Sequence, residues 1–370
     1  MKTALVHDWL NQIGGAEDVL EKLVEMYPEA PLYTSVYSSE KMPAHWQEWD
    51  IRPGFIDRFP FARTKQQLYF PLYPLNFERF DFREYDLVLT NKSGFCHGII
   101  TEPETMHICY CLTPTRYLWR YHQYAERENF STTMRRTLLP FLTFLRVWDR
   151  QAADRVDHFI AISEAVRQRI KKFYQRDSVI IYPPVDIDRF TPVATQDVED
   201  YYLFVGRLVP YRRLDLLVQA FNEMGRPLLI AGSGRDREKL EKIAKDNVKL
   251  LGFVADEELP ELVAKCRAFI WPGEEDFGIA PIQAMAAGRP VIAYASGGVL
   301  DTVVPGTGHF FYEQSITAIK EAVENFDTTQ INPDFVRQQA EQYDTAVFKQ
   351  KMNDFIQQKW EAKGDQRRVS

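Results

Sequence analysis

Short runs of β-branched and aromatic residues alternate along the chain with stretches in which apolar residues recur at the spacing of a helix. This alternation is typical of a parallel α/β sheet, in which a helix connects each strand to the next. In the first half, the runs predict strands over Thr3 to His7, Leu32 to Tyr37, Asp86 to Thr90, Met106 to Leu112, His158 to Ile162 and Val179 to Tyr182. In the second half, they predict strands over Tyr201 to Val205, Pro227 to Ala231, Val248 to Leu251, Ala268 to Trp271 and Pro290 to Tyr294.

A segment with two prolines, Tyr182 to Phe190, separates the two series of strands. The chain has 370 residues, enough for two or three folding units of about 150 residues, so we expect this segment to be a hinge between two similar domains. The predicted divisions are residues 1–183, residues 184–345 and a C-terminal helix with a frayed tail over residues 346–370, of which 364–370 form the tail.

The composition excludes several classes of protein. With 45% hydrophobic and 26% charged residues, the chain is neither disordered nor fibrous. No uncharged apolar run reaches the roughly 18 residues of a membrane span, and His7 and Asp8 end the first apolar run too early for a signal peptide. We therefore expect a cytoplasmic protein. The four cysteines include no C-x-x-C pair, which argues against a metal site and a disulfide framework.

The net charge of -7 arises entirely in the second half, because residues 1–182 contain 23 basic and 23 acidic groups. Within the first half, residues 116–176 contain 13 basic and 6 acidic groups and include an apolar stretch, Leu138 to Trp148. Such a segment is typical of a helix on an anionic membrane surface, and equally of a core helix with a solvated basic side. Residues 52–82 are rich in Phe and Tyr, which either line an acceptor or lipid groove or pack between domains. No nucleic-acid-binding motif is present.

A strand, a polar loop and the start of a helix follow one another between Ile270 and Gln283. The first backbone N–H groups of a helix lack partners within it and favour anions such as phosphate. Glu275 adds a carboxylate that suits the hydroxyl groups of a sugar. The same stretch is also typical of an ordinary helix with acidic residues near its N-terminus.

Two other loops leave predicted strands of the second half, and the carboxyl ends of such strands are where open α/β sheets bind ligands. Guanidinium groups in the first loop suit a diphosphate, which each can bind with two hydrogen bonds. The second loop begins like G-x-G-x-x-G, but Arg237 replaces the last glycine, which disfavours a nicotinamide cofactor. The residues concerned are Gly206, Arg207, Arg212, Arg213, Gly232 and Gly234. Together the three loops predict a site for a nucleotide diphosphate.

In the first half, Gly14 and Gly15 follow the first strand and permit close approach of a ligand to the backbone. His97 and Arg116 also follow predicted strands, where each either reaches a ligand or serves as an ordinary loop residue. The D-x-D sequence at 186–188 is similar to a metal site of other sugar transferases. It lies in the hinge without a second acidic cluster, so we expect no metal there.

These motifs resemble those of glycosyltransferase family 4, whose members are retaining enzymes of the GT-B fold. The resemblance extends over nearly the whole chain and rests on residues 14–17, 206–208, 232–234 and 275–283, which occur in the family's order and spacing. It implies two Rossmann-like α/β domains that face each other across a cleft, with the last helix crossing back to the first domain. It implies a nucleotide-sugar donor and neither a metal ion nor another cofactor.

The resemblance also implies roles for individual residues. Arg207 and Arg212 would hold the diphosphate, Glu275 would contact the donor sugar and Gln283 the ribose. The other donor-binding residues would be Gly14, Gly15, Gly206, Gly232, Gly234, Val254, Phe277, Gly278, Ile279 and Ala280. The acceptor side would include Asp8 and Arg116.

Three positions depart from the family's pattern. Gln283 replaces the second glutamate of E-x7-E, so its contact with ribose would carry no charge. Arg212 replaces a lysine and changes the geometry of phosphate binding. Leu112 stands where many relatives have their catalytic histidine, which makes His97 a candidate substitute in catalysis.

Within the family, residues 7–10, 112–119 and 207–213 most resemble bacterial mannosyltransferases that build surface polysaccharides from GDP-mannose. The predicted activity is metal-independent transfer of a hexose, mannose from GDP-mannose, with retention, to a glycan or lipid-linked glycan at the inner face of the cell membrane. Two alternatives stay open. A GT-B sugar-nucleotide epimerase would need acid and base groups around the sugar, and a nucleotide-sugar-binding protein without catalysis is favoured by Leu112 and Gln283.

Overall fold

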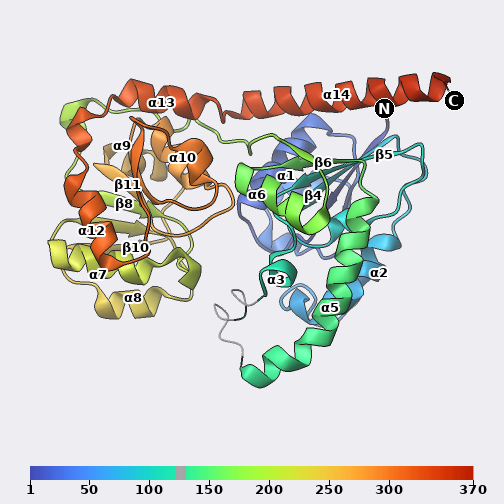
Figure 1. Ribbon diagram of the computed structural model, residues 1–370, viewed down its shortest axis with the longest axis horizontal. Helices are drawn as coiled ribbons and strands as arrows, with labels where there is room; N and C mark the ends of the chain where they lie inside the picture. The colour runs from blue at the N-terminus through green and yellow to red at the C-terminus, as the bar shows by residue number, and fades with distance from the viewer. Residues whose placement is uncertain (122–124, 126–130, 370) are drawn as a thin grey trace. The chain divides into compact units, whose positions relative to one another are not determined.

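The computed structural model describes residues 1–121, 125 and 131–369, which form two compact α/β units (Figure 1). The first unit comprises Met1–Tyr182 together with Lys349–Ser370, and the second comprises Pro183–Phe348. Each unit contains a parallel sheet, of seven strands in the first and six in the second. The predicted pair of parallel α/β sheets is thus confirmed.

The first sheet has the strand order β3-β2-β1-β4-β5-β6-β7. Its strands are β1 (Thr3–His7), β2 (Leu32–Thr34), β3 (Ile51–Pro53), β4 (Leu87–Lys92), β5 (Met106–Cys111), β6 (His158–Ala161) and β7 (Ser178–Ile180). Sequence patterns missed β3, which has only three residues and ends in Pro53. Proline donates no hydrogen bond to a neighbouring strand, so it is confined to sheet edges such as this one.

Helices cover the first sheet and follow most of its strands (Figure 1). The α-helices of this unit are α1 (Gly15–Met26), α2 (Tyr73–Glu78), α3 (Arg116–Trp119), α5 (Thr132–Asp154) and α6 (Glu164–Arg169). Short 3₁₀ helices occur at Ser39–Lys41, Ala44–Glu48, Phe55–Arg58, Gln66–Leu72 and Cys96–Gly98, and a π-helical turn at Ile170–Tyr174.

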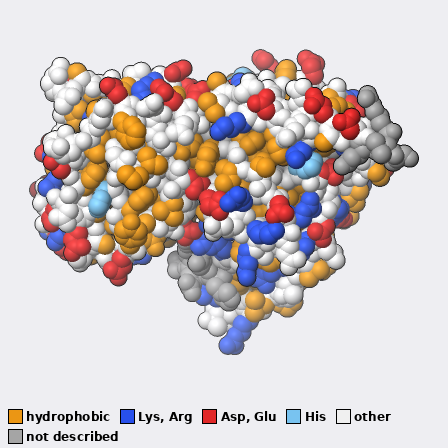
Figure 2. Space-filling model, turned by 45° about the horizontal axis from the view of Figure 1, so that its top comes forward, with side chains coloured by type: hydrophobic (Ala, Val, Ile, Leu, Met, Phe, Trp, Pro, Cys, Tyr) orange, Lys and Arg blue, Asp and Glu red, His pale blue; other side chains and the backbone are white. Residues whose placement is uncertain are grey.

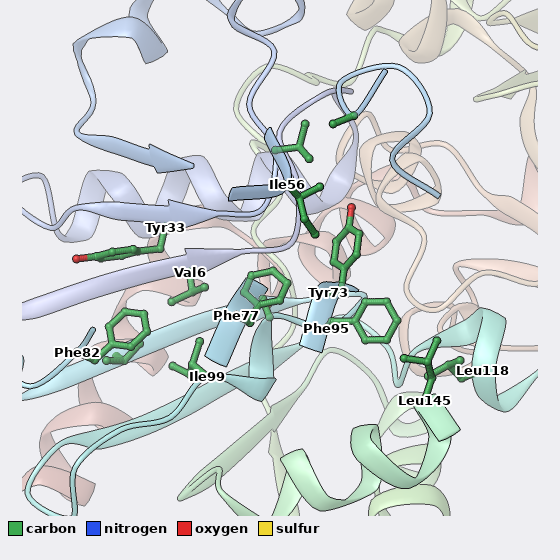
Figure 3. Packing of buried hydrophobic residues seen from close by; sticks show 14 of the residues in the cluster. Val6, Tyr33, Ile56, Tyr73, Phe77, Phe82, Phe95, Ile99, Leu118 and Leu145 are labelled. Atoms are coloured by element: carbon green, nitrogen blue, oxygen red, sulfur yellow. The ribbon is translucent and has the colours of Figure 1, made fainter. Parts of the chain in front are cut away.

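The Phe- and Tyr-rich segment 52–82 supplies much of the core of the first unit. Figure 3 shows Phe77 and Phe82 near Val6 on the sheet, and Tyr73 next to Phe77 and Phe95. Each fully buried aromatic side chain stabilises the fold by about 1.5–3 kcal/mol. Most of these rings therefore stabilise the first unit itself, whereas Phe61 is 70% exposed.

The second sheet has the order β10-β9-β8-β11-β12-β13. Its strands are β8 (Tyr202–Val205), β9 (Leu228–Ala231), β10 (Val248–Gly252), β11 (Ala268–Trp271), β12 (Val291–Tyr294) and β13 (Gly308–Phe311), the last of which the sequence patterns missed. Its α-helices are α7 (Leu214–Met224), α8 (Arg237–Ile243), α9 (Leu259–Lys265), α10 (Ile279–Ala286), α11 (Val299–Thr302), α12 (Ile316–Asn325) and α13 (Pro333–Glu341). Its 3₁₀ helices are Thr195–Asp197, Pro210–Arg212 and Thr328–Gln330.

The C-terminal helix α14 (Thr345–Val369) packs against the first unit from Lys349 onward, as expected. The Lys349 ammonium lies 2.6 Å from a carboxylate oxygen of Glu25 on α1, and Lys363 Nζ donates to the Thr105 carbonyl at 2.9 Å. Helix α14 continues through Gly364 to Val369, and the frayed tail over residues 364–370 stays a prediction. A single interior glycine costs a helix only about 1 kcal/mol, and the three residues before Gly364 are good helix formers.

Candidate functional site

The loops that follow β8, β9 and β10 lie side by side at the carboxyl edge of the second sheet. The Gly206 N–H donates to the Ala231 carbonyl at 2.9 Å, and the Gly232 N–H donates to the Gly252 carbonyl at 2.6 Å. The structure therefore brings together loops that are separated by 20 residues or more in the sequence.

Glycine is required in the β9 loop because the β8 loop passes directly over it. Gly232 has φ +133°, and a Cβ at this position would overlap the Gly206 carbonyl oxygen. A Cβ at Gly234 would overlap the Leu208 carbonyl oxygen in the same way. The packing of two loop backbones thus explains these glycines without a bound phosphate.

Arg212 lies at the centre of this edge with its guanidinium over the Trp271 ring, 4.4 Å from the ring centroid. Its Nη2 forms an ion pair with Glu275 Oε2 at 2.9 Å. The side chains of Arg212 and Glu275 are only 11% and 21% exposed. Arg212 Nε and Nη1 are buried and have no hydrogen-bond partner, and the contact of Glu275 Oε2 with Nη2 is an ion pair without the geometry of a hydrogen bond. Buried donors without partners cost free energy, so the arrangement favours an anionic ligand that accepts from both.

The loop that carries Glu275 is held by its backbone. The Glu275 carbonyl accepts a hydrogen bond from the Gly298 N–H at 2.9 Å, and a Cβ at Gly297 would overlap the same oxygen. Helix α10 then begins after Gly278, which has φ +94° and caps the helix. Of the residues predicted to bind donor here, Phe277 and Gly278 are buried, and Ile279, Ala280 and Gln283 are half-buried.

The other predicted residues of the second unit differ in their surroundings. Arg207 is exposed, and Val254 is half-buried just after β10. Arg213 has φ +51° and forms an ion pair with Asp215 at 3.0 Å in the first turn of α7. Arg213 therefore stabilises the start of a helix, whereas Arg207 and Arg212 have guanidinium N–H groups to offer a diphosphate.

In the first unit, Gly14 caps α1 and the exposed Gly15 begins it. Behind them, His7 Nε2 lies 3.3 Å from Glu17 Oε1, and both side chains are almost fully buried. One interpretation of the sequence is that His7 is a hydrogen-bonded histidine under the glycine loop, and the structure identifies Glu17 as its partner. This pair connects the end of β1 to the first turn of α1 and so holds the glycine loop between them.

The structure corrects the expectation that Asp8 faces an acceptor. Asp8 is fully buried, and its carboxylate accepts four backbone hydrogen bonds from the loop after β4. The donors are the N–H groups of Ser93 at 2.7 Å, Gly94 at 2.6 Å, Phe95 at 2.6 Å and Cys96 at 2.8 Å. All the strong acceptor positions of Asp8 serve the fold.

The structure also corrects the catalytic role considered for His97. Its side chain is fully buried, stacks on Tyr174 with centroids 5.6 Å apart and has Nε2 3.2 Å from the Asp149 carbonyl oxygen. Burial holds the pKa of His97 well below its ordinary range. Leu112 has no acid or base group, so neither position offers one at the surface. Arg116 is half-buried at the start of α3.

No metal cluster is evident in the described parts of the chain: His, Cys, Asp and Glu side chains nowhere gather in threes there. The cysteines Cys96, Cys109, Cys111 and Cys266 are free and buried. Sequence reasoning also missed Lys92 and Asp149, two fully buried charged side chains. Asp149 has a signal in the sequence, a charge within an apolar helical stretch, whereas Lys92 follows Thr90 and Asn91 at the polar end of β4 and has none.

Two family models match consecutive segments of the chain, which correspond to the two units of the fold in the same order. Residues 13–189 match the model described as Glycosyltransferase Family 4, and residues 188–343 match the model described as Glycosyl transferases group 1.

Among curated relatives, a GDP-mannose-dependent monoacylated alpha-(1-6)-phosphatidylinositol monomannoside mannosyltransferase of Corynebacterium glutamicum is 32% identical over 189 residues, which are 43% of this chain and 50% of the relative. The O-antigen chain mannosyltransferase RfbU of Salmonella typhimurium is 28% identical over 161 residues, 40% of this chain and 45% of the relative. The matches thus span about half the length of these relatives.

Solved structures support the fold over almost the full chain. Sucrose-phosphate synthase from Thermosynechococcus elongatus aligns with a TM-score of 0.74 and 18% identity, covering 98% of this chain and 100% of that one. Anabaena HepE in complex with UDP aligns with a TM-score of 0.70 and 17% identity, covering 97% and 100%. Because the two family matches follow each other from residue 13 to residue 343 on this pair of parallel sheets, the chain belongs to the family 4 and group 1 glycosyltransferases and has the GT-B fold.

Proposed function

We propose that the protein transfers mannose from GDP-mannose to a glycan or lipid-linked glycan, with retention of configuration and without a metal ion. The observation that carries the proposal is the Arg212 side chain, whose Nε and Nη1 are buried without partners beside Glu275. A diphosphate supplies the acceptor oxygens that these donors lack, and the sugar attached to it would lie next to the Glu275 carboxylate.

The chemistry of transfer requires that negative charge on the leaving diphosphate be stabilised. Arg207, Arg212 and the first N–H groups of α10 are positive groups on one sheet edge that suit this task. In the retaining mechanism proposed for the family, the leaving phosphate takes the acceptor proton on the face where the new bond forms. The chain's contribution is then mainly electrostatic, and it needs no histidine at position 112.

The nucleotide and sugar in the proposal rest on relatives. The curated mannosyltransferase of Corynebacterium glutamicum is described as GDP-mannose-dependent, and segments 112–119 and 207–213 resemble such enzymes. The HepE structure contains UDP, so uridine nucleotides belong in the same test.

Titration calorimetry with GDP-mannose, UDP-glucose, ADP-glucose and dTDP-glucose, in EDTA, tests the donor site. We expect GDP-mannose to bind, and Arg207→Ala to weaken it about 10- to 100-fold, because a charge-assisted hydrogen bond contributes about 1.5–3 kcal/mol. Lys249→Ala is the matched control, since it removes one exposed charge from β10 without touching the loops. Equal affinity in both variants, or no binding of any nucleotide sugar, would refute the donor site.

We further propose that the acceptor is lipid-linked and that α5 contacts the inner face of the cell membrane, in a cytoplasmic protein. Helix α5 buries Leu142 and Leu145 in the core, yet exposes Phe141 by 57% and Phe144 by 64%. Its outer side is therefore apolar as well as basic, which favours a membrane surface over a merely solvated one. Every helix among the described residues is too short or too polar to cross a bilayer.

Flotation with vesicles of phosphatidylglycerol and phosphatidylcholine tests this contact. We expect Phe141→Ser with Phe144→Ser to reduce vesicle binding more than tenfold, since two phenyl groups inserted into lipid contribute roughly 3–6 kcal/mol. Phe335→Ser, which changes an exposed ring on α13, is the control. Arg136→Glu should weaken binding to anionic vesicles alone. Unchanged flotation of the double variant contradicts the proposed contact.

One observation favours a second candidate, a nucleotide-sugar-binding protein without catalysis. His97 is buried, and position 112 is a leucine, which has no acid or base group, so neither residue supplies one beside a substrate. Slow release of GDP from GDP-mannose without acceptor separates the two, because only a site that activates the leaving group hydrolyses its donor. Tight binding without any release of GDP would identify the binding protein.

A further inference from the structure

Two charged side chains in the first unit are fully buried and have no part in the donor site described above. Lys92 ends β4, and Asp149 lies in α5. Charged groups are rarely buried completely unless they are paired and hydrogen-bonded, because removing them from water is costly. Their partners therefore show what they are used for.

Both side chains hold the segment that joins β5 to α3. Lys92 Nζ donates to the Thr113 carbonyl at 3.2 Å and to Thr115 Oγ1 at 3.1 Å. Thr115 Oγ1 also lies 2.7 Å from Asp149 Oδ1, and Trp119 Nε1 donates to Asp149 Oδ2 at 2.6 Å. The two charged side chains thus hold the segment Thr113–Trp119 by polar contacts near its beginning, in its middle and at its end.

The contacts come from elements that are far apart in the sequence. Tyr174 completes the cluster, since its hydroxyl donates to Asp149 Oδ2 at 2.8 Å and its ring lies 5.4 Å from Lys92 Nζ. Thr115 Oγ1 is also 2.7 Å from the Gly94 carbonyl oxygen, in the loop that Asp8 holds. Burial raises the pKa of Asp149, while Lys92 and the hydrogen bonds from Trp119 and Thr115 oppose that rise.

The segment held in this way carries Arg116, directly after Thr115 and at the start of α3. It follows the carboxyl end of β5, and this edge of a parallel sheet is where α/β folds place ligand-binding residues. These contacts on both sides of Arg116 hold the backbone of that residue in place. This lowers the ordering cost of binding a ligand.

We propose that Lys92 and Asp149 are positioning residues that hold Thr113–Trp119 in the conformation in which Arg116 binds the acceptor. The inference rests on the proposed transferase function and deepens its acceptor side. It predicts that loss of the cluster weakens the acceptor's binding while the donor site in the second unit is unaffected.

The test compares Lys92→Met, which keeps the length of the side chain, with the double variant Lys92→Met/Asp149→Asn. The double variant leaves no uncompensated buried charge, so it keeps the test usable if the single variant folds poorly. Lys351→Met is the matched control, because it removes an exposed charge from α14 in the same unit. GDP-mannose is the donor and octyl α-mannoside is the acceptor probe.

Amide hydrogen exchange, the kinetics with octyl mannoside and the binding of GDP-mannose are measured on each variant. In the variants, amide hydrogen exchange of residues 112–119 should be about tenfold faster than in the wild type and in the Lys351→Met control. The KM for octyl mannoside should rise about tenfold, with the Kd for GDP-mannose and kcat changed less than about twofold. A purely structural role would lower the amount of active protein, and hence kcat, without moving the KM for acceptor.

The outcomes separate this inference from the function on which it rests. Unchanged exchange in segment 112–119 overturns the positioning role, and faster exchange with an unchanged acceptor KM overturns its link to the acceptor. If the wild type binds no nucleotide sugar, the proposed function fails, and the link to an acceptor fails with it. The exchange data then still decide whether Lys92 and Asp149 hold the segment.

Discussion

Replacing Asp8 with asparagine tests whether this carboxylate supports the fold or serves a substrate. Its two oxygens accept backbone N–H groups at 2.6–2.8 Å from the loop after β4, two to each oxygen. An asparagine oxygen satisfies one pair, while its amide nitrogen, a donor, faces the other pair. Two charge-assisted bonds at about 1.5–3 kcal/mol each are lost, so the variant should be destabilised by about 3–6 kcal/mol.

Urea unfolding followed by tryptophan fluorescence measures this loss. Of the seven tryptophans in the chain, only Trp271 lies in the second unit, so the signal reports mainly on the first. A fall of about 3–6 kcal/mol exceeds a third of the stability of many domains and moves the midpoint by at least 1 M urea for a slope of about 1–3 kcal/mol per M.

Glu48→Gln is the control, because it removes one exposed negative charge from the same unit. If Asp8→Asn unfolds at the same urea concentration as this control, the four hydrogen bonds contribute nothing and the structural account of Asp8 is refuted. A stable variant with a raised acceptor KM would instead restore the role expected from the sequence.

Two more predictions concern stability. Gly232→Ala should destabilise the second unit by about 1–3 kcal/mol from its positive φ alone, and further because the new Cβ overlaps Gly206. Gly225→Ala is the control, because Gly225 has φ +68° and open space around it and should show only the backbone cost. Equal unfolding free energies of the two variants would contradict the packing argument. Burial lowers the pKa of His107 from 6.5 to about 3, so the unfolded chain takes up its proton first and stability falls as the pH drops below 6.5. Between pH 6.5 and about pH 4, the contribution of His107 lowers the free energy of unfolding by about 3 kcal/mol. Urea unfolding at several pH values measures it: His107→Gln should abolish this contribution, whereas the control His309→Gln, which changes an exposed histidine, should leave it in place.

Strands were predictable where burial on both faces makes them continuous apolar runs, as in β4 and β5. The pattern failed for β3, which is partly exposed and contains Pro53, and for β13, which has four residues and starts with Gly308. In both cases the neighbouring strand, rather than the local sequence, decides that the segment is extended. Helix α14 differs, because it continues through Gly364, whose cost to a helix is only about 1 kcal/mol.

Site residues were predictable where the binding groups, backbone glycines or a guanidinium, lie in a loop between a strand and the next helix. Gly232 and Gly234 follow β9 closely, and Arg212 lies in the loop between β8 and α7, so their common edge followed from the order of elements. Asp8 and His97 also follow strands, yet both are buried, and their hydrogen-bond partners lie more than 50 residues away. A motif does not reveal whether a polar side chain points to solvent or into the core.

The sequence alone determined the α/β class, the two successive sheets and the loops that carry glycine, arginine and glutamate, because these depend on periodicity and local backbone demands. Only the tertiary structure decided which polar residues are buried. The Arg212–Glu275 ion pair, the four hydrogen bonds of Asp8 and the grip of Lys92 and Asp149 on Thr115 all join segments distant in the chain. Burial and pairing of charge are properties of the packed chain, since the cost of desolvation and the partner that offsets it come from different elements.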